Sequence, residues 1–204
     1  MEAVQRSAEW HESRLGKFTS SEIHKLMGIK GLGLTGEGYA FDKAVESFLG
    51  IAEENFVTYD MQMGIELEPL AFNKFSEIMD LQFIKVDNCG FIEFTDYTGS
   101  SPDGLVDDNS VLEIKCPKAS TFFKLVADGK IDDKYFYQMQ HQMMCTGRQK
   151  AYLFNYYILD GVEYHHTIEV LRDEEVLDKM RKRISEAVKI RDQYISKLNN
   201  NKQF

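Results

Sequence analysis

Apolar residues recur every three or four positions in two long segments of the chain, which is the period of one face of an α-helix. In residues 61–79 the apolar positions are Leu67, Leu70, Ala71, Phe75 and Ile78. In residues 173–198 they are Leu177, Met180, Ile184, Ala187, Val188, Ile195 and Leu198, with Arg191 on the same side. We predict one amphipathic helix over each segment, with its apolar side packed on the protein core.

Shorter helices are predicted on either side of a glycine-rich segment. Thr19 and Glu22 have the spacing of a capping box, which indicates that a helix begins at Thr19. Residues 31–36 match the pattern GxGxxG, but they follow a helical pattern rather than the strand that a dinucleotide-binding loop requires. We therefore expect a mobile loop over residues 28–38 and a helix over residues 39–49. Further helical patterns cover residues 120–127 and 134–145.

Short extended runs lie between the helical segments, at residues 83–86, 90–94, 104–106 and 111–116. Two more runs, residues 151–158 and 164–170, flank the turn dipeptide Asp160-Gly161 and predict a β-hairpin. Helices alternating with strands in this order predict an α/β fold with a central mixed β-sheet flanked by helices. We expect a single domain over residues 1–204, with its core in about residues 10–170 and a C-terminal amphipathic helix.

The composition is that of an ordinary globular protein. Of 204 residues, 43% are hydrophobic and 28% are charged, which excludes a disordered or fibrous chain. The three cysteines have an odd count and no CxxC spacing, so neither a disulfide framework nor a zinc ribbon is indicated. No apolar run approaches the roughly 18 residues of a membrane span, and the N-terminus lacks a signal-peptide pattern. We expect a cytoplasmic protein with no membrane partner.

The net charge of −9 argues at first against a nucleic-acid partner, because binding to phosphates normally requires lysine and arginine. The charge is unevenly distributed, however. Residues 111–150 carry a net charge of +3, which leaves −12 on the remainder of the chain. One basic face on an otherwise acidic protein is compatible with DNA binding in a groove.

The segment with the clearest chemical pattern is the predicted strand 111–116. Side chains alternate along a strand, so Glu113 and Lys115 lie on one face while the apolar residues between them face the core. Asp103 lies beside a Pro/Gly turn that can bring its carboxylate next to Glu113. These carboxylates and the Ile114 backbone carbonyl form an oxygen-rich set suited to Mg²⁺, and Lys115 would orient or deprotonate an attacking water. We expect one or two Mg²⁺ ions, for which Mn²⁺ would substitute; the simpler alternative is an exposed turn Asp and a surface Glu-x-Lys pair.

Glu68 is a further candidate ligand of the same ion. On the predicted helix 61–79 its neighbours on the same face are Phe72, Phe75 and Met79, so its carboxylate would be desolvated and would need a cationic partner. Glu66 has more polar neighbours, and we therefore prefer Glu68. The alternative role for Glu68 is a charge near the N-terminus of a helix, where the macrodipole stabilises it.

Other combinations of reactive residues are less convincing. His141 and Cys145 share a helical face, and His165 and His166 are adjacent, but no third zinc ligand has a suitable spacing. No GxSxG or Cys/His pattern indicates nucleophilic catalysis. Lys118 and Lys124 are candidates for contacts with backbone phosphates.

Pro102-Asp103 followed after nine residues by Glu113-Ile114-Lys115 resembles the PD-(D/E)xK nuclease signature. Over about residues 10–155 the chain is similar to one branch of that superfamily, the lambda-exonuclease or YqaJ-like viral recombinase family. The blocks that carry the resemblance are Trp10-His11-x-x-Arg14-Leu15-Gly16, Thr19-x-Ser21-Glu22, Gly64-x-x-x-Glu68, Ser101-Pro102-Asp103-Gly104-Leu105, Leu112-Glu113-Ile114-Lys115-Cys116-Pro117 and Gln138-x-Gln140.

The resemblance implies a restriction-endonuclease-like core and a metal-dependent exonuclease. It implies 5′-to-3′ degradation of one strand of double-stranded DNA from its ends, which leaves 3′ overhangs for phage-type recombination. It also implies a ring-shaped homotrimer and a single-strand annealing protein as partner. For the site, it implies that Gln138 bonds Lys115 or the water, and that Arg14, Thr19 and Ser21 hold a terminal 5′ phosphate; an ordinary polar helix face is the alternative for Gln138.

Two other functions remain open from the sequence. The first is an endonuclease of the same superfamily, either restriction-like or junction-cleaving. The second is a DNA-binding or assembly protein that keeps the fold without catalysis. The presence of Asp103, Glu113 and Lys115 together argues against the second alternative.

Overall fold

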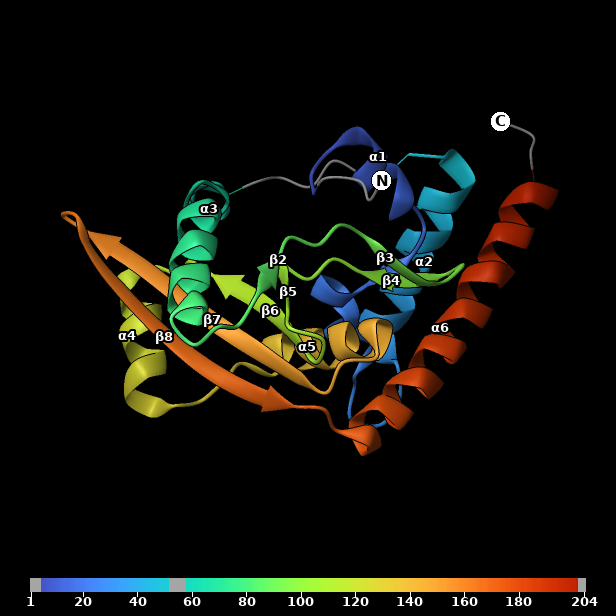
Figure 1. Ribbon diagram of the computed structural model, residues 1–204. Helices are drawn as coiled ribbons and strands as arrows, with labels where there is room; N and C mark the ends of the chain where they lie inside the picture. The colour runs from blue at the N-terminus through green and yellow to red at the C-terminus, as the bar shows by residue number, and fades with distance from the viewer. Residues whose placement is uncertain (1–4, 52–57, 202–204) are drawn as a thin grey trace.

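The computed structural model describes residues 5–51 and 58–201, in which helices and strands alternate along the chain (Figure 1). The helices are α1 (Ala8–Ser13), the 3-10 helix η1 (Ser20–Leu26), α2 (Gly33–Leu49), α3 (Tyr59–Asp80), α4 (Ala119–Asp128), α5 (Asp133–Thr146) and α6 (Glu174–Asn200). The strands are β1 (Phe18–Thr19), β2 (Val86–Asp87), β3 (Ile92–Thr95), β4 (Thr98–Ser100), β5 (Gly104–Val106), β6 (Ser110–Lys115), β7 (Lys150–Leu159) and β8 (Val162–Leu171).

The larger sheet has the strand order β2-β5-β6-β7-β8. Only β6 and β7 pair in parallel, and the other neighbours are antiparallel. A parallel pair needs a long crossover connection, which α4 and α5 supply here. The sheet is therefore mixed and flanked by helices, as the order of predicted elements indicates.

The two faces of this sheet are covered by different helices, because successive side chains of a strand point to opposite faces. Tyr152, Phe154 and Tyr156 of β7 pack with Phe75 of α3 in one hydrophobic cluster. Leu153 of β7 packs with residues of α5 in another cluster. In Figure 1, α3 and α5 accordingly lie on opposite faces of the sheet.

A smaller sheet has the strand order β1-β4-β3 and is joined to α5 by a buried polar network. The imidazole of His141 on α5 lies between two hydroxyl groups: Nδ1 is 2.7 Å from Ser20 Oγ, and Nε2 is 3.0 Å from Thr98 Oγ1. Ser20 Oγ also donates to Ser100 Oγ at 2.7 Å, and Thr98 Oγ1 donates to the Phe18 carbonyl at 2.7 Å. The network connects η1, α5 and two strands inside the core.

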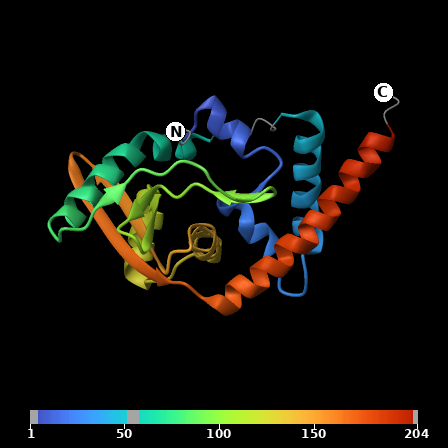
Figure 2. The same ribbon diagram turned by 45° about the vertical axis from the view of Figure 1, so that its right-hand side comes forward.

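The long helix α6 packs along α2, away from the larger sheet (Figure 2). Its residues Leu177, Met180 and Ile184 are buried in one cluster with η1 and α2, which confirms the predicted apolar face. Arg191 Nη1 donates to the Gly16 carbonyl at 3.1 Å. In the part of the chain that the structure describes, no helix is both long enough and apolar enough to cross a membrane.

Most predicted elements are confirmed, but the predicted loop over residues 28–38 is wrong in its second half. Helix α2 already begins at Gly33. A Cβ on Gly36 would lie 2.9 Å from Leu32 Cβ and 3.2 Å from the Lys25 carbonyl oxygen. Gly36 is therefore required by close packing of α2 against η1 and does not indicate a flexible loop.

The structure differs from the sequence predictions in three further respects. The helix expected at Thr19 is a 3-10 helix, and the Thr19 side chain makes no capping hydrogen bond. The strand predicted over 83–86 shortens to β2, because Phe83 has φ of +60° and follows a turn. The short elements α1, β1 and β4 were not predicted, since elements of so few residues carry little periodicity.

Candidate active site

Strand β6 places Glu113 and Lys115 on the face that α5 covers, as strand alternation predicts. Glu113 is 2% exposed, and its Oε1 lies 2.6 Å from Lys115 Nζ. Burial opposes the charged form of Lys115, but the carboxylates of Glu113 and Asp103 outweigh this effect and raise its pKa. A buried ion pair on an otherwise apolar strand is costly unless other donors satisfy it.

Helix α5 supplies those other donors. Gln138 Nε2 donates to Glu113 Oε1 at 2.7 Å, and Gln142 Nε2 donates to Glu113 Oε2. The two glutamines lie one helical turn apart and are both buried. Gln138 thus contacts the carboxylate, whereas the resemblance implied a bond to Lys115 or to the water. Gln140 points elsewhere, since it donates to the Leu171 carbonyl at 2.7 Å.

The turn before β5 brings Asp103 to the end of β6. Asp103 Oδ2 accepts a 2.7 Å hydrogen bond from the Ile114 N–H, and the Asp103 N–H donates to the Leu112 carbonyl at 3.0 Å. Burial, and then the nearby carboxylates of Glu113 and Glu68, raise the pKa of Asp103 well above its usual value. The three acids are therefore close enough to repel one another.

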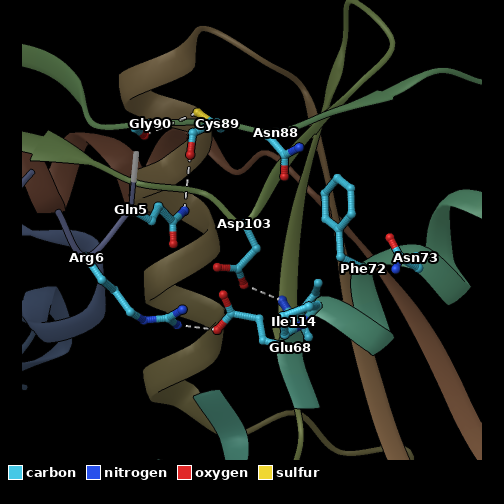
Figure 3. A pocket seen from close by; sticks show the side chains of 11 residues that line it. Gln5, Arg6, Glu68, Phe72, Asn73, Asn88, Cys89, Gly90, Asp103 and Ile114 are labelled. Carbon is cyan, nitrogen blue, oxygen red and sulfur yellow. Dashed lines mark hydrogen bonds and ion pairs between the residues drawn. The ribbon is translucent and has the colours of Figure 1, made fainter. Parts of the chain in front are cut away.

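Glu68 lies on α3 and lines a cavity of about 620 Å³ together with Asp103 and Ile114 (Figure 3). The cavity is also lined by Gln5, Arg6, Pro69, Phe72, Asn73, Asn88, Cys89 and Gly90. Glu66 is exposed on the same helix and accepts a hydrogen bond from Gln62 at 3.0 Å. The structure thus places Glu68, and not Glu66, beside Asp103.

The acidic residues fit a divalent cation in the kind of donor that they offer. Glu68, Asp103 and Glu113 present carboxylate oxygens, which Mg²⁺ prefers, and their mutual repulsion would be relieved by a cation. Among residues 5–51 and 58–201, however, no three acidic, histidine or cysteine side chains surround one point as a preformed metal site. Glu113 instead has both oxygens engaged by Lys115, Gln138 and Gln142.

Arg14 lies at the centre of a polar cluster with Trp10, Thr19 and Ser101, which we call the Arg14 cluster. Its guanidinium lies 4.0 Å from the centre of the Trp10 ring, and it donates to Ser101 Oγ and Thr19 Oγ1, both at 3.3 Å. Trp10 Nε1 also donates to Ser101 Oγ, at 2.9 Å. Ser21, the third residue predicted to hold a terminal phosphate, is exposed at the start of η1.

The electrostatics of the Arg14 cluster favour an anion. Burial lowers the pKa of Arg14 to about 10, which means that its positive charge is poorly solvated. Of the residues that the structure describes, no Asp or Glu lies within 4.0 Å of the Arg14 guanidinium nitrogens. A desolvated guanidinium with only hydroxyl groups as hydrogen-bond partners is suited to a phosphate.

The predicted backbone-contact lysines are both exposed. Lys118 precedes α4, and Lys124 lines a smaller cavity of about 380 Å³ with Lys130, Lys134 and Tyr135. The Tyr135 ring connects this cavity to the site, because its centre lies 4.8 Å from Lys115 Nζ and 4.7 Å from Lys134 Nζ.

Several residues of the site were not predicted to have a role. Trp10 and Ser101 belong to the sequence blocks of the resemblance, so a signal for them was present. Gln142 lies one helical turn after Gln138, and this spacing on a predicted helix was its signal in the sequence. Arg6, which forms a 2.5 Å ion pair with Glu68, lies in a segment without periodicity or motif and gave no signal.

The chain is similar to exonucleases whose structures are known. LHK-Exo, an alkaline exonuclease from Laribacter hongkongensis, is similar to this chain with a TM-score of 0.83 at 29% identity, over 95% of this chain and 97% of that chain. Its structure in complex with dAMP gives a TM-score of 0.84 at the same identity and coverage. A phage-related exonuclease from Haemophilus somnus 129PT shares the fold, with a TM-score of 0.69 at 19% identity over 89% of this chain and 96% of that chain.

The sequence comparisons give one family. No curated protein matches the chain. Residues 9–149 match the model of the YqaJ-like viral recombinase domain, which is well over half of the chain. The arrangement of a mixed sheet flanked by helices agrees with these exonuclease structures. The protein therefore belongs to the family of YqaJ-like viral recombinase domains.

Proposed function

We propose that this protein is a Mg²⁺-dependent exonuclease that degrades one strand of double-stranded DNA from its 5′ ends and leaves 3′ overhangs. The main observation in its favour is the pair formed by the buried Glu113 and the partly exposed Lys115, with Glu113 held by two glutamines next to Asp103. An acid and a base on one strand, beside a second acid whose pKa is raised, is an arrangement suited to hydrolysis of a phosphodiester. The family and the similarity to LHK-Exo support the same activity.

The metal would be held by the carboxylates of Asp103, Glu113 and Glu68 and by the Ile114 carbonyl. When bound, Mg²⁺, or Mn²⁺ in its place, supplies a water of lowered pKa and neutralises charge on the phosphate. One ion is the minimum, and Asp103 is the candidate bridge to a second. Lys115 keeps its proton at neutral pH, because the neighbouring carboxylates raise its pKa. It therefore serves to orient the attacking water and to stabilise developing negative charge.

The Arg14 cluster supports recognition of a 5′-phosphorylated end. The guanidinium of Arg14 donates hydrogen bonds to the hydroxyl groups of Thr19 and Ser101. Among the described residues, no carboxylate lies within 4.0 Å of its nitrogens. Ser101 is also only two residues from Asp103, so a phosphate held here would lie close to the proposed metal ligands.

The remaining features of the proposal rest on the family alone. They are a ring-shaped homotrimer, a single-strand annealing protein as partner, and a role in phage-type recombination. Lys118 and Lys124 are proposed to contact backbone phosphates farther from the end, since both are exposed near the Lys115 side of the site.

The decisive experiment compares a 5′-phosphorylated linear duplex with covalently closed circular DNA. Each substrate is incubated with the wild-type chain in Mg²⁺, in Ca²⁺ and in EDTA. We expect loss of the linear DNA in Mg²⁺ only, and intact circles. Lys115→Ala should slow degradation by roughly 10²–10⁴-fold, the usual contribution of a group that handles a proton or developing charge. Lys85→Ala is the matched control, because Lys85 is 78% exposed and pairs only with Asp87 among the described residues.

The same experiment separates the alternatives. Cleavage of closed circles would indicate an endonuclease of the same superfamily. No loss of either DNA in Mg²⁺ would indicate a DNA-binding protein without catalysis. Equal digestion by wild type and Lys115→Ala would contradict the role proposed for the lysine.

A further inference from the structure

Two consecutive residues, Gln5 and Arg6, line the larger cavity and contact the backbone beside Asp103 and the carboxylate of Glu68, respectively (Figure 3). Gln5 Nε2 donates to the Pro102 carbonyl at 2.8 Å and to the Cys89 carbonyl at 3.2 Å. Arg6 Nη2 donates to Glu68 Oε2 at 2.5 Å. Pro102 immediately precedes Asp103 in the sequence. The dipeptide therefore links the turn that carries Asp103 to the helix that carries Glu68.

The backbone at Arg6 is held in an unusual conformation to make this link. Its φ is +68°, in the left-handed region that residues with a side chain rarely adopt. The cost is about 1 kcal/mol. The next residue, Ser7, caps α1 by accepting a 3.2 Å hydrogen bond from the Trp10 N–H. Local strain of this kind persists where the surrounding contacts fix the chain, and here these contacts reach the site on one side and the Trp10 helix on the other.

The Arg6–Glu68 ion pair is too exposed to be explained by stability alone. Its side chains are 40% and 24% exposed, and such pairs stabilise a fold by about 0–1 kcal/mol. Its clearer consequence is orientation. Arg6 engages one oxygen of Glu68, and Figure 3 shows the other oxygen on the side of Asp103.

We propose that Gln5 and Arg6 are positioning residues, which fix the Glu68 carboxylate relative to Asp103 and thereby set the affinity of the site for its divalent ion. The inference rests on the proposed function, because it assigns Glu68 and Asp103 to an ion. Carboxylates that bind a metal through one oxygen are commonly hydrogen-bonded through the other, and loss of such a partner typically weakens metal binding 10–100-fold.

The opposing effect is electrostatic, since a guanidinium repels a divalent cation. If repulsion dominated, removal of the Arg6 charge would tighten metal binding. Gln5 separates the two effects, because its amide is neutral and its contacts are to backbone carbonyls on the Asp103 side. Positioning predicts weaker binding when either residue is changed, whereas repulsion predicts tighter binding for Arg6 alone.

The test is calorimetric titration of Mn²⁺ and Ca²⁺ into the chain without DNA. We expect Arg6→Met to weaken binding about 10–100-fold, Gln5→Met to weaken it by a smaller factor, and Arg6→Lys to restore part of the loss. Arg181→Met is the matched control, because Arg181 is 42% exposed and pairs with acids on α6 far from the site. Melting temperatures of all variants should agree within a few degrees, which shows that they fold.

A kinetic measurement adds a second readout. With Arg6→Met, degradation of DNA should recover toward the wild-type rate as Mg²⁺ is raised, while KM for DNA stays unchanged. Unchanged or tighter Mn²⁺ binding by Arg6→Met overturns the inference and leaves the proposed function intact. Failure of the wild-type chain to take up either ion overturns both.

Discussion

Gln138 on α5 donates a 2.7 Å hydrogen bond to Glu113 Oε1, the same oxygen that lies 2.6 Å from Lys115 Nζ. Gln142 engages the second oxygen of Glu113. The carboxylate is thus fixed by donors from the strand that carries it and from the helix that covers it. This explains how a charged group can be buried on β6, since hydrogen bonds replace the water that it has lost.

The first prediction concerns these two amides. Gln138→Leu and Gln142→Leu should each lower kcat by roughly tenfold or more, because the first leaves Glu113 Oε1 with Lys115 as its one remaining donor among the described residues and the second leaves Oε2 without one. The double variant should lose less than the product of the two effects, since both act on one group. Single-turnover degradation of linear duplex measures this. Gln140→Leu is the control, because Gln140 bonds the Leu171 carbonyl and the Asp173 N–H and should affect stability only.

The second prediction concerns the Arg14 cluster. The wild-type chain should degrade 5′-phosphorylated duplex faster than the same duplex with a 5′-hydroxyl. Arg14→Met should remove this preference, because the desolvated guanidinium is the only cation among the four residues of the cluster. The measurement is the ratio of kcat/KM for the two substrates. A variant that keeps the wild-type ratio would show that the phosphate is bound elsewhere.

The third prediction concerns the stability of the metal-free chain. Burial and the neighbouring carboxylates raise the pKa of Asp103, so its charge destabilises the fold as pH rises through that value. Asp103→Asn should therefore raise the free energy of unfolding at neutral pH, by about 0.5–2 kcal/mol, while abolishing degradation of DNA. Denaturant unfolding in EDTA measures the effect. A loss of stability would mean that the negative charge strengthens the hydrogen bond from the Ile114 N–H by more than the repulsion costs.

The fourth prediction concerns acid stability. Burial lowers the pKa of His141 from 6.5 to about 3, so the folded state holds the imidazole neutral. The unfolded state takes up a proton below about pH 6.5, which means that stability is complete above this pH and is lost as pH falls toward 3. The slope should reach about 1.4 kcal/mol per pH unit in this window. His141→Gln should flatten the pH dependence of unfolding between pH 4 and 6.5; an unchanged slope would assign it to other groups.

Long elements with clear periodicity could be predicted from the sequence. Helix α3 and the β7–β8 hairpin were predicted within about two residues, because each repeats its pattern over many positions. The smaller sheet could not be predicted, since β1 and β4 are too short for a pattern. The start of α2 was obscured because Gly36 resembles a loop residue although close packing requires it.

The residues of the candidate site also fall into those that a local sequence pattern predicts and those that it does not. Glu113 and Lys115 follow from strand alternation, and Glu68 follows from the apolar face of its helix. The contacts of Gln142 and Arg6 depend on how α5 and the N-terminal residues pack against distant segments. Such contacts have no local pattern, and only the folded chain brings them together.

The buried imidazole of His141 has a mechanical consequence. Its hydrogen bonds connect β4 and η1, which lie next to Ser101 and Thr19 of the Arg14 cluster, to α5. The same helix binds Glu113 through Gln138. The proposed binding site of a terminal phosphate and the proposed site of hydrolysis are thus both connected to helix α5 by buried hydrogen bonds. A movement of one site relative to the other would break hydrogen bonds inside the core. The distance between the two proposed sites is therefore fixed by the folded structure.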